Sequence, residues 1–208
     1  CILYFTSPFA TTVKYQSCKF NQRLGRLILK VDSYRKSVCI LKDALVSDRL
    51  SFKIVHGDPK ISNFMFENHT SKCTALIDLD TVQPGLILYD IADCVRSACN
   101  VSGEDHQDFS SVQFNVDIFH SIIYSYFSVA PKLLTQNDLH YLPFAIRLLP
   151  VELGIRFLED FLNGNSYFNV DYDSQNLDRA EVQFNLAAQV EHQWTSVLQI
   201  IDLLKRTI

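Results

Sequence analysis

The chain has 208 residues, of which 48% are hydrophobic and 20% are charged. This balance predicts a globular domain with a sizeable buried core and excludes an intrinsically disordered chain. Nineteen Lys and Arg residues against 23 Asp and Glu residues give a formal net charge of -4. That charge argues against a dedicated nucleic-acid binder, which would carry a basic surface. No stretch approaches the roughly 20 consecutive apolar residues of a membrane span, so no membrane partner is expected.

Six cysteines are scattered along the chain, and no two of them stand at C-x-x-C spacing. A chain of this size and apolar content needs no disulfides for stability, so free thiols in a reducing compartment are expected. The sequence shows no secretory signal pattern, and a cytoplasmic location is therefore predicted.

The first half of the chain predicts helix followed by short strands. Apolar residues recur at spacings of three, four and seven over residues 20–50, which predicts helix with an interruption near Ser33. Three short β-prone runs follow, at residues 53–56, 63–67 and 74–80. The polar stretch 67–72 predicts a hairpin between the last two runs, and Pro84-Gly85 is expected to break the chain.

The second half predicts helices only. They are expected over residues 112–130, 151–162 and 176–205. Thr135 and Asp138 have the spacing of a helix-capping box, whereas Pro143 and Pro150 are expected to interrupt the helical pattern that follows. Asn163-Gly164 is a typical helix ending.

Together these elements predict one compact domain of the α+β class, mostly α, with a small β region at residues 53–80. Residues 1–16 show no clear period and are expected to form a loop or the tail of an earlier element.

The chemically informative residues lie on the β region. They occur in the runs His56-Gly57-Asp58-Pro59-Lys60-Ile61-Ser62-Asn63 and Ile77-Asp78-Leu79-Asp80. A hairpin at this point would bring Asp58, Asn63 and Asp78 to the same end of a small sheet. Hard oxygen ligands of this kind suit Mg²⁺. Phosphoryl transfer needs a carboxylate to orient the acceptor hydroxyl and oxygens to hold the metal, and these residues could supply both. In the alternative interpretation the acids merely cap turns, which fits an isolated HGD better than the full pattern.

The pattern H-G-D-x-x-x-x-N followed by I-D resembles the catalytic lobe of aminoglycoside phosphotransferases and choline-kinase-type enzymes, relatives of the protein kinases. Within that superfamily the chain is most similar to the N-acetylhexosamine 1-kinases, over residues 20–195. The motifs that carry this similarity are Ile77-Asp78-Leu79-Asp80-Thr81-Val82-Gln83-Pro84-Gly85, Tyr89-Asp90, Asp93, Arg96, Gly154-Ile155-Arg156-Phe157-Leu158, Tyr167-Phe168, Asn176-Leu177, Arg179-Ala180 and Gln183-Phe184.

The resemblance implies an ATP- and Mg²⁺-dependent kinase that phosphorylates the anomeric hydroxyl of an N-acetylhexosamine-like sugar. Asp58 would be the catalytic base, and Asn63 and Asp78 would be the Mg²⁺ ligands. His56 would orient the catalytic loop, and Asp80 would either contact metal-bound water or substrate, or be structural.

The resemblance also implies residues outside the β region. Arg156 and Tyr167 match the positions that grip the sugar, and the Arg fork suits a hydroxyl-rich ligand. The alternative for Arg156 is a surface residue or an ion pair with a neighbouring acid, Glu159 or Asp160. Two further residues are expected in supporting roles: Asp90, bracing the catalytic loop, and Arg96, bonded to Asp90 or Asp93.

Two departures from the pattern concern the acceptor and the nucleotide. Gly57 and Pro59 stand where the N-acetylhexosamine branch usually has Asn and Thr, and Gly57 matches the aminoglycoside-kinase form instead, so the acceptor stays open. Residues 1–50 hold no strand-rich, Gly-rich segment, so residues 1–208 are expected to be a C-terminal lobe whose nucleotide-binding N-terminal lobe is missing and would act in cis.

Three other functions remain open. The chain could be a catalytically silent kinase-like module that binds sugar or a partner. It could also be an aminoglycoside- or choline-type small-molecule kinase. A metal-dependent phosphoesterase that uses His56, Asp58, Asp78 and Asp80 is the third, and it is weaker because no second His-rich cluster is present.

Overall fold

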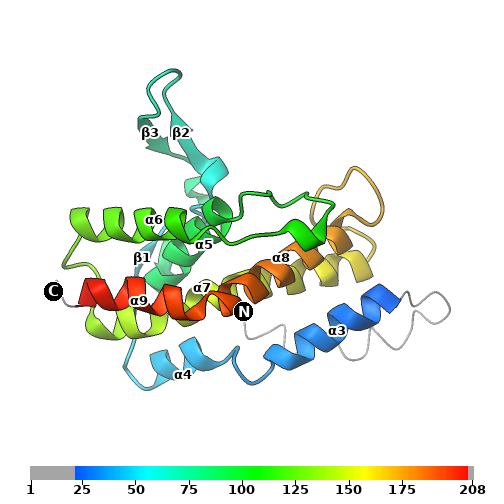
Figure 1. The fold of residues 1–208 in the computed structure, drawn as a ribbon, viewed down its shortest axis with the longest axis horizontal. Coiled ribbons are helices and arrows are strands. Elements are labelled where there is room, and N and C mark those ends of the chain that lie inside the picture. The colour runs from blue at the N-terminus through cyan, green and yellow to red at the C-terminus, as the bar shows by residue number, and fades with distance from the viewer. Residues whose placement is uncertain (1–21, 206–208) are drawn as a thin grey trace.

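A computed structural model describes residues 22–205 of the chain (Figure 1). The helices are α3 (Gln22–Tyr34), α4 (Ile40–Val46), α5 (Ile87–Cys99), α6 (Val116–Val129), α7 (Gln136–Leu162), α8 (Gln175–His192) and α9 (Trp194–Lys205). The strands are β1 (Lys53–Val55), β2 (Phe64–Phe66), β3 (Cys73–Leu76) and β4 (Gln83–Gly85), and the 3-10 turns are η1 (Ile61–Asn63), η2 (Leu79–Thr81) and η3 (Phe109–Ser111). The predicted class, mostly α with a small β region, is confirmed. The loop expected for residues 1–16 lies outside the described residues.

The β region consists of two antiparallel pairs, β2 with β3 and β1 with β4. The β2–β3 hairpin confirms the prediction and projects away from the helical body (Figure 1). The expectation that Pro84-Gly85 breaks the chain was wrong, because both residues belong to β4 and Pro84 pairs with Ile54. A two-stranded sheet has only edge strands, and an edge strand tolerates a proline that lacks its N–H.

The helices enclose two apolar cores that share α7. One core contains residues of α4, α5, α6, α9 and the first half of α7, the other contains residues of α3 and the second half of α7, and α8 contributes residues to both. α7 and α8 approach closely at Gly154, where an added Cβ would lie 3.1 Å from a ring carbon of Phe184. α7 is therefore the central helix of the fold.

The capping box predicted at the start of α7 is confirmed. The Thr135 hydroxyl accepts from the backbone N–H of Asp138, and the Asp138 carboxylate accepts from the backbone N–H of Thr135. The expected interruption at Pro143 and Pro150 was wrong, because both prolines are buried inside one helix of 27 residues. Each proline removes one helical hydrogen bond, and the apolar packing of this buried helix outweighs that loss.

The interruption predicted near Ser33 is confirmed, since α3 ends at Tyr34 and α4 begins at Ile40. The helix predicted over residues 112–130 begins later, at Val116. There the Asn115 side chain accepts hydrogen bonds from the first turn and caps the helix.

The single helix predicted over residues 176–205 was also wrong. α8 ends at His192 and α9 begins at Trp194, and the Gln193 side chain at the turn donates to the Phe114 carbonyl at 2.7 Å. The turn directs α8 and α9 into different parts of the core. In α9, Val197 and Ile201 are fully buried.

Four cysteines in the described part of the chain, Cys39, Cys73, Cys94 and Cys99, are free thiols, as expected. Among residues 22–205, none of the helices combines the length and the hydropathy that crossing a membrane requires.

Candidate active site

The loop that follows β1 is fixed to the first turn of α5. The Asp90 carboxylate accepts a hydrogen bond from the backbone N–H of His56 at 2.7 Å and another from Gly57 at 2.9 Å. Hydrogen bonds to a carboxylate are stronger than those between neutral groups. Asp90 therefore fixes the start of the loop to α5, in agreement with its predicted supporting role.

The His56 ring joins this loop to the segment after β3. Its Nδ1 atom lies 3.3 Å from the backbone N of Asp58, and its Nε2 atom lies 3.0 Å from the Ile77 carbonyl oxygen. The neutral tautomer with hydrogen on Nε2 satisfies both contacts, because Nδ1 then accepts and Nε2 donates. Both ring nitrogens of His56 are thus engaged in contacts that join the loop to the segment after β3, as the predicted orienting role requires.

Asp58 is held by two side chains of its own loop. Its Oδ2 atom accepts from Lys60 Nζ at 2.6 Å and from Asn63 Nδ2 at 3.1 Å. The same Asn63 amide donates to the Asp58 carbonyl at 2.8 Å. No side chain or backbone group of residues 22–205 donates to Oδ1, so this oxygen can accept from a bound molecule.

Asp78 reaches the same end of the hairpin through the backbone. The preceding residue, Ile77, donates its N–H to the Asn63 carbonyl at 3.0 Å. Asp78 itself has a left-handed backbone conformation, with φ of 68°, and begins the turn η2 that contains Asp80. Both carboxylates are exposed, and neither forms an ion pair or hydrogen bond with the described residues. The structure thus joins Asp58 and Asn63 directly and places Asp78 next to a residue bonded to both His56 and Asn63.

The donors present fit a magnesium ion. The Asn63 amide nitrogen is used on Asp58, which leaves its Oδ1 oxygen for a ligand, and Asp78 offers a carboxylate with no hydrogen-bond partner among residues 22–205. Mg²⁺ binds such oxygens and keeps several waters and substrate phosphates as its other ligands. Within that range, no three His, Cys, Asp or Glu side chains form a metal cluster, so such an ion would depend on phosphate and water.

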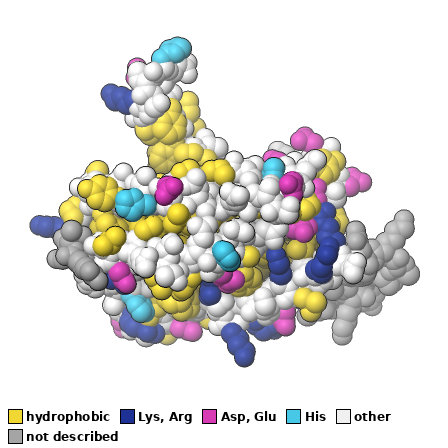
Figure 2. Space-filling view, in the orientation of Figure 1, with side chains coloured by type: hydrophobic (Ala, Val, Ile, Leu, Met, Phe, Trp, Pro, Cys, Tyr) yellow, Lys and Arg dark blue, Asp and Glu magenta, His cyan; other side chains and the backbone are white. Residues whose placement is uncertain are grey.

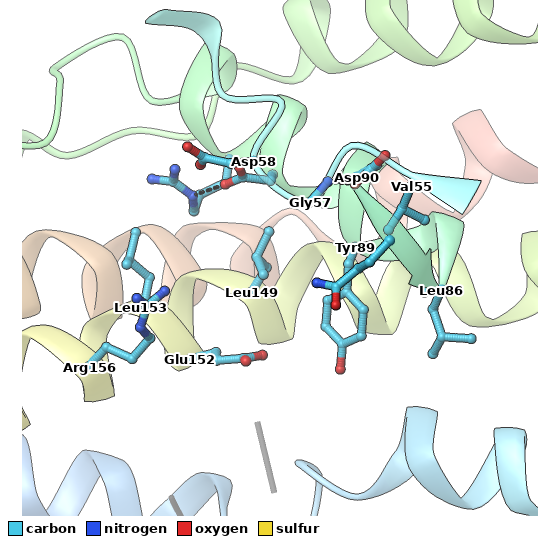
Figure 3. A pocket seen from close by; sticks show the side chains of 14 residues that line it. Val55, Gly57, Asp58, Leu86, Tyr89, Asp90, Leu149, Glu152, Leu153 and Arg156 are labelled. Carbon is cyan, nitrogen blue, oxygen red and sulfur yellow. Dashed lines mark hydrogen bonds and ion pairs between the residues drawn. The ribbon is translucent and has the colours of Figure 1, made fainter. Parts of the chain in front are cut away.

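A pocket of 330 Å³ opens beside Asp58, between the loop and α7. Figure 3 shows Asp58 and Gly57 on one side of it, with Leu149, Glu152, Leu153 and Arg156 of α7 on the other. Apolar walls with a few converging polar groups are typical of a small-molecule site.

The pocket is also lined by partly buried ionisable groups from α5 and α7. Burial raises the pKa of Asp93, and the positive charge of Arg96 offsets that rise only in part. Burial likewise raises the pKa of Glu152 despite the charge of Arg156, and it raises the pKa of Tyr89. Groups shifted in this way beside a pocket are common at functional sites.

Arg96 is 7% exposed and bonds to Asp93 at 2.8 Å, one of the two partners expected, and to Glu104 at 3.0 Å. Asp90 is not its partner, since the Asp90 carboxylate binds the backbone of the loop.

A second pocket of 290 Å³ lies at the C-terminal end of α7, and Arg156 and Tyr167 both line it. Arg156 also lines the first pocket. The Arg156 guanidinium lies 5.8 Å from the ring centre of Tyr167 and 5.5 Å from that of Phe168. Arg156 forms no ion pair with a described acid within 4 Å, so the alternative of a pair with Glu159 or Asp160 is not realised. The structure therefore brings Arg156 and Tyr167 together at the second pocket, and Arg156 alone also borders the pocket beside Asp58.

Sequence reasoning missed three polar residues of the site: Lys60 as the partner of Asp58, and Asp93 and Glu152 as pocket residues. Lys60 carries a local signal, because it follows Asp58 by two residues in the same loop. Glu152 lies four residues before Arg156 and therefore on the same face of a helix. The sequence gives no signal that this face of α7 packs against the loop after β1, because the two segments come together only in the folded chain.

Residues 21–109 match the model of the phosphotransferase enzyme family, APH. The matched segment contains the whole loop after β1, both β pairs and α5, and therefore every candidate site residue except those of α7 and the loop after it. The mostly helical fold with small antiparallel strand pairs agrees with the helical lobe of a kinase-like fold.

Proposed function

We propose that this chain is the catalytic lobe of an APH-type phosphotransferase, which transfers the γ-phosphate of ATP to a hydroxyl group of a small molecule. One observation carries the proposal: Asp58 stands at the edge of a pocket with Asn63 bonded to it, inside the segment that matches the family. Positioning and charge neutralisation are the main requirements of this reaction.

In the proposed reaction the acceptor hydroxyl lies in the 330 Å³ pocket and donates to Asp58 Oδ1. The acceptor oxygen forms a bond to the γ-phosphorus while the bond between that phosphorus and the β,γ-bridging oxygen breaks. The hydroxyl proton passes to Asp58 and ADP leaves with the bridging oxygen. Lys60 and Asn63 hold the other carboxylate oxygen and so keep Oδ1 directed at the acceptor.

Two groups would balance the charge of the phosphates. Asn63 and Asp78 would hold Mg²⁺, which when bound neutralises phosphate oxygens. Lys60 places a second positive charge 2.6 Å from Asp58. Asp80 is exposed in η2, two residues after Asp78, and would bind a water molecule of the same ion.

The acceptor we propose is a sugar, with an N-acetylhexosamine phosphorylated at its anomeric hydroxyl as the first candidate. Arg156 offers several hydrogen-bond donors to a ring with many hydroxyls, and Tyr167 offers an exposed aromatic face beside it. An aminoglycoside or choline-type alcohol is the alternative, and the carboxyls of Asp93 and Glu152, which line the same pocket, would accept hydrogen bonds from the amino groups of an aminoglycoside.

The nucleotide would bind between this lobe and a second lobe. Figure 2 shows hydrophobic side chains on the projecting hairpin and around its base. Met65, Phe66, Leu79 and Val82 are between 46% and 61% exposed in this region. A large exposed apolar surface indicates a contact with another protein surface, and we propose that the nucleotide-binding lobe of the same protein covers it.

The test uses the full-length protein that carries this sequence, incubated with ATP, Mg²⁺ and a panel of N-acetylhexosamines, aminoglycosides and choline. Phosphorus NMR identifies the product and its linkage. The Asp58→Asn variant should lose about 100-fold or more of the transfer rate, the range of general-base catalysis, and should keep its unfolding midpoint. Asp173→Asn is the control, because its carboxylate forms no ion pair or hydrogen bond with residues 22–205.

Several outcomes would overturn the proposal. Transfer that survives Asp58→Asn would exclude Asp58 as the base. Phosphate release that needs no acceptor would favour the phosphoesterase. Sugar binding without any transfer would favour the catalytically silent module.

A further inference from the structure

Asp160 is a buried carboxylate near the end of α7, with only 6% of its surface exposed. Its Oδ1 atom accepts from the backbone N–H groups of Ser166 and Tyr167, both at 2.9 Å. Its Oδ2 atom accepts from the backbone N–H of Phe168 at 3.0 Å and from the Asn176 amide at 2.9 Å. Three consecutive backbone N–H groups are therefore paired with one side chain.

These contacts set the path of the chain after α7. The helix ends at Leu162, and residues 164 and 165 take left-handed conformations, with φ of 82° and 57°. The chain thereby turns back, and the N–H of Asn165 donates to the Asp160 carbonyl at 2.8 Å. A segment without helix or strand has no regular partners for its N–H groups, and here the Asp160 carboxylate supplies them.

The same segment carries the aromatic side of the second pocket. Tyr167 is 74% exposed, and its ring contacts Phe168 edge-on at 4.8 Å between ring centres. Phe168 in turn packs on Phe157 of α7 at 4.5 Å. Arg156 lies beside both rings of the segment and lines the pocket next to Asp58. The backbone held by Asp160 therefore places the Tyr167 and Phe168 rings that Arg156 of α7 lies against.

We propose that Asp160 is a positioning residue for acceptor recognition, acting through the 166–168 segment on Tyr167 and Arg156. This inference rests on the proposed function for its acceptor. Asp160 borders the second pocket, but each of its carboxylate oxygens already accepts hydrogen bonds from the segment or from Asn176, so it acts on the acceptor through the segment.

The test compares Asp160→Asn with wild type in the full-length protein. Asparagine has nearly the same shape, but it replaces one carboxylate oxygen with an N–H donor that faces a backbone N–H. Amide exchange of Ser166, Tyr167 and Phe168 should accelerate at least tenfold. The KM for the best acceptor should rise about tenfold, while kcat and the KM for ATP should change less than twofold.

Asp138→Asn is the matched control. Asp138 is 3% exposed, lies at the other end of the same helix and also accepts several hydrogen bonds. This variant should lose stability as Asp160→Asn does, and should leave acceptor KM and exchange at residues 166–168 unchanged.

Two results would overturn the positioning role: unchanged exchange at residues 166–168 in Asp160→Asn, or an equal rise in acceptor KM in Asp138→Asn. The failure of the proposed function looks different, because wild type would then transfer no phosphate. In that event saturation-transfer NMR with N-acetylglucosamine decides the question. Binding that is lost in Asp160→Asn and kept in Asp138→Asn supports the role, and equal signals in all three proteins refute it.

Discussion

Gly57 allows the loop that carries Asp58 to pack against η2. Its φ is +89°, and an added Cβ would lie 2.7 Å from the Thr81 carbonyl oxygen. A left-handed conformation costs an L-residue about 1–2 kcal/mol. Because a backbone oxygen cannot rotate away, the loop or η2 must also shift, which breaks the hydrogen bond from the Thr81 hydroxyl to the His56 carbonyl, 2.7 Å long. That bond contributes about 0.5–1.5 kcal/mol, so Gly57→Ala should destabilise the protein by about 1.5–3.5 kcal/mol.

Gly103→Ala separates the two parts of this cost. Gly103 has a φ of +81°, but an added Cβ would meet no heavy atom within 4 Å. Its substitution should therefore cost only the conformational part, about 1–2 kcal/mol. Urea unfolding followed by the fluorescence of the single Trp, Trp194, measures both variants. Equal losses of unfolding free energy in the two variants would refute the argument that the contact with Thr81 requires glycine. Gly57→Ala should also lose phosphotransfer, because the shift displaces Asp58, whereas Gly103→Ala should not.

Two further predictions concern the carboxylates of Asp90 and Asp138, which accept hydrogen bonds from backbone N–H groups or from a lysine. Asp90→Asn should lose one of the two hydrogen bonds to the loop and cost about 1.5–3 kcal/mol in urea unfolding; a loss no larger than that of Asp173→Asn would show that Asp90 does not brace the loop. Burial alone would raise the pKa of Asp138, but hydrogen bonds from Lys53 and from the helix start at Thr135 lower it overall below its ordinary value of 3.8. A carboxylate whose pKa is lowered by folding stabilises the protein above its unfolded pKa, and this contribution is lost as the pH falls through the folded value. Asp138→Asn should therefore cost about 2 kcal/mol at pH 7, and the difference from wild type should shrink when unfolding is measured below pH 4. A difference that stays constant or grows on acidification would contradict the direction of this pKa shift.

The hairpin and its loop could be predicted from the sequence because their signals are local. β2 and β3 are separated by a polar, turn-prone stretch, and the pairing of Phe64 with Leu76 follows from it. Asp58 and Asn63 are close together because only four residues separate them and the short turn η1 directs Asn63 back toward Asp58. Lys60 lies in the same loop, so its contact with Asp58 could have been predicted from the short sequence separation as well.

The rest of the fold depends on tertiary contacts that no local pattern reveals. A long apolar periodicity predicts one helix over residues 176–205, but the chain gains two packing surfaces by turning at Gln193. Pro143 and Pro150 are helix breakers in isolation, and they remain inside α7 because apolar neighbours surround this helix. β4 is short and contains a proline, so only its pairing with β1 identifies it as a strand.

The candidate site combines both kinds of information. Its chemical side, around Asp58, is compact in sequence and lies within the segment that matches the phosphotransferase family. Its acceptor side depends on α7, where Glu152 and Arg156 are ordinary helix-surface residues by their spacing. The packing of α7 against α5 and α8 turns this surface toward the loop, and Asp160 accepts hydrogen bonds from the backbone of the segment beside it. A substitution on the proposed acceptor side should therefore alter which molecule binds while Asp58 and its partners stay in place, so Asp160→Asn should change mainly the acceptor KM, whereas Asp58→Asn should change the transfer rate.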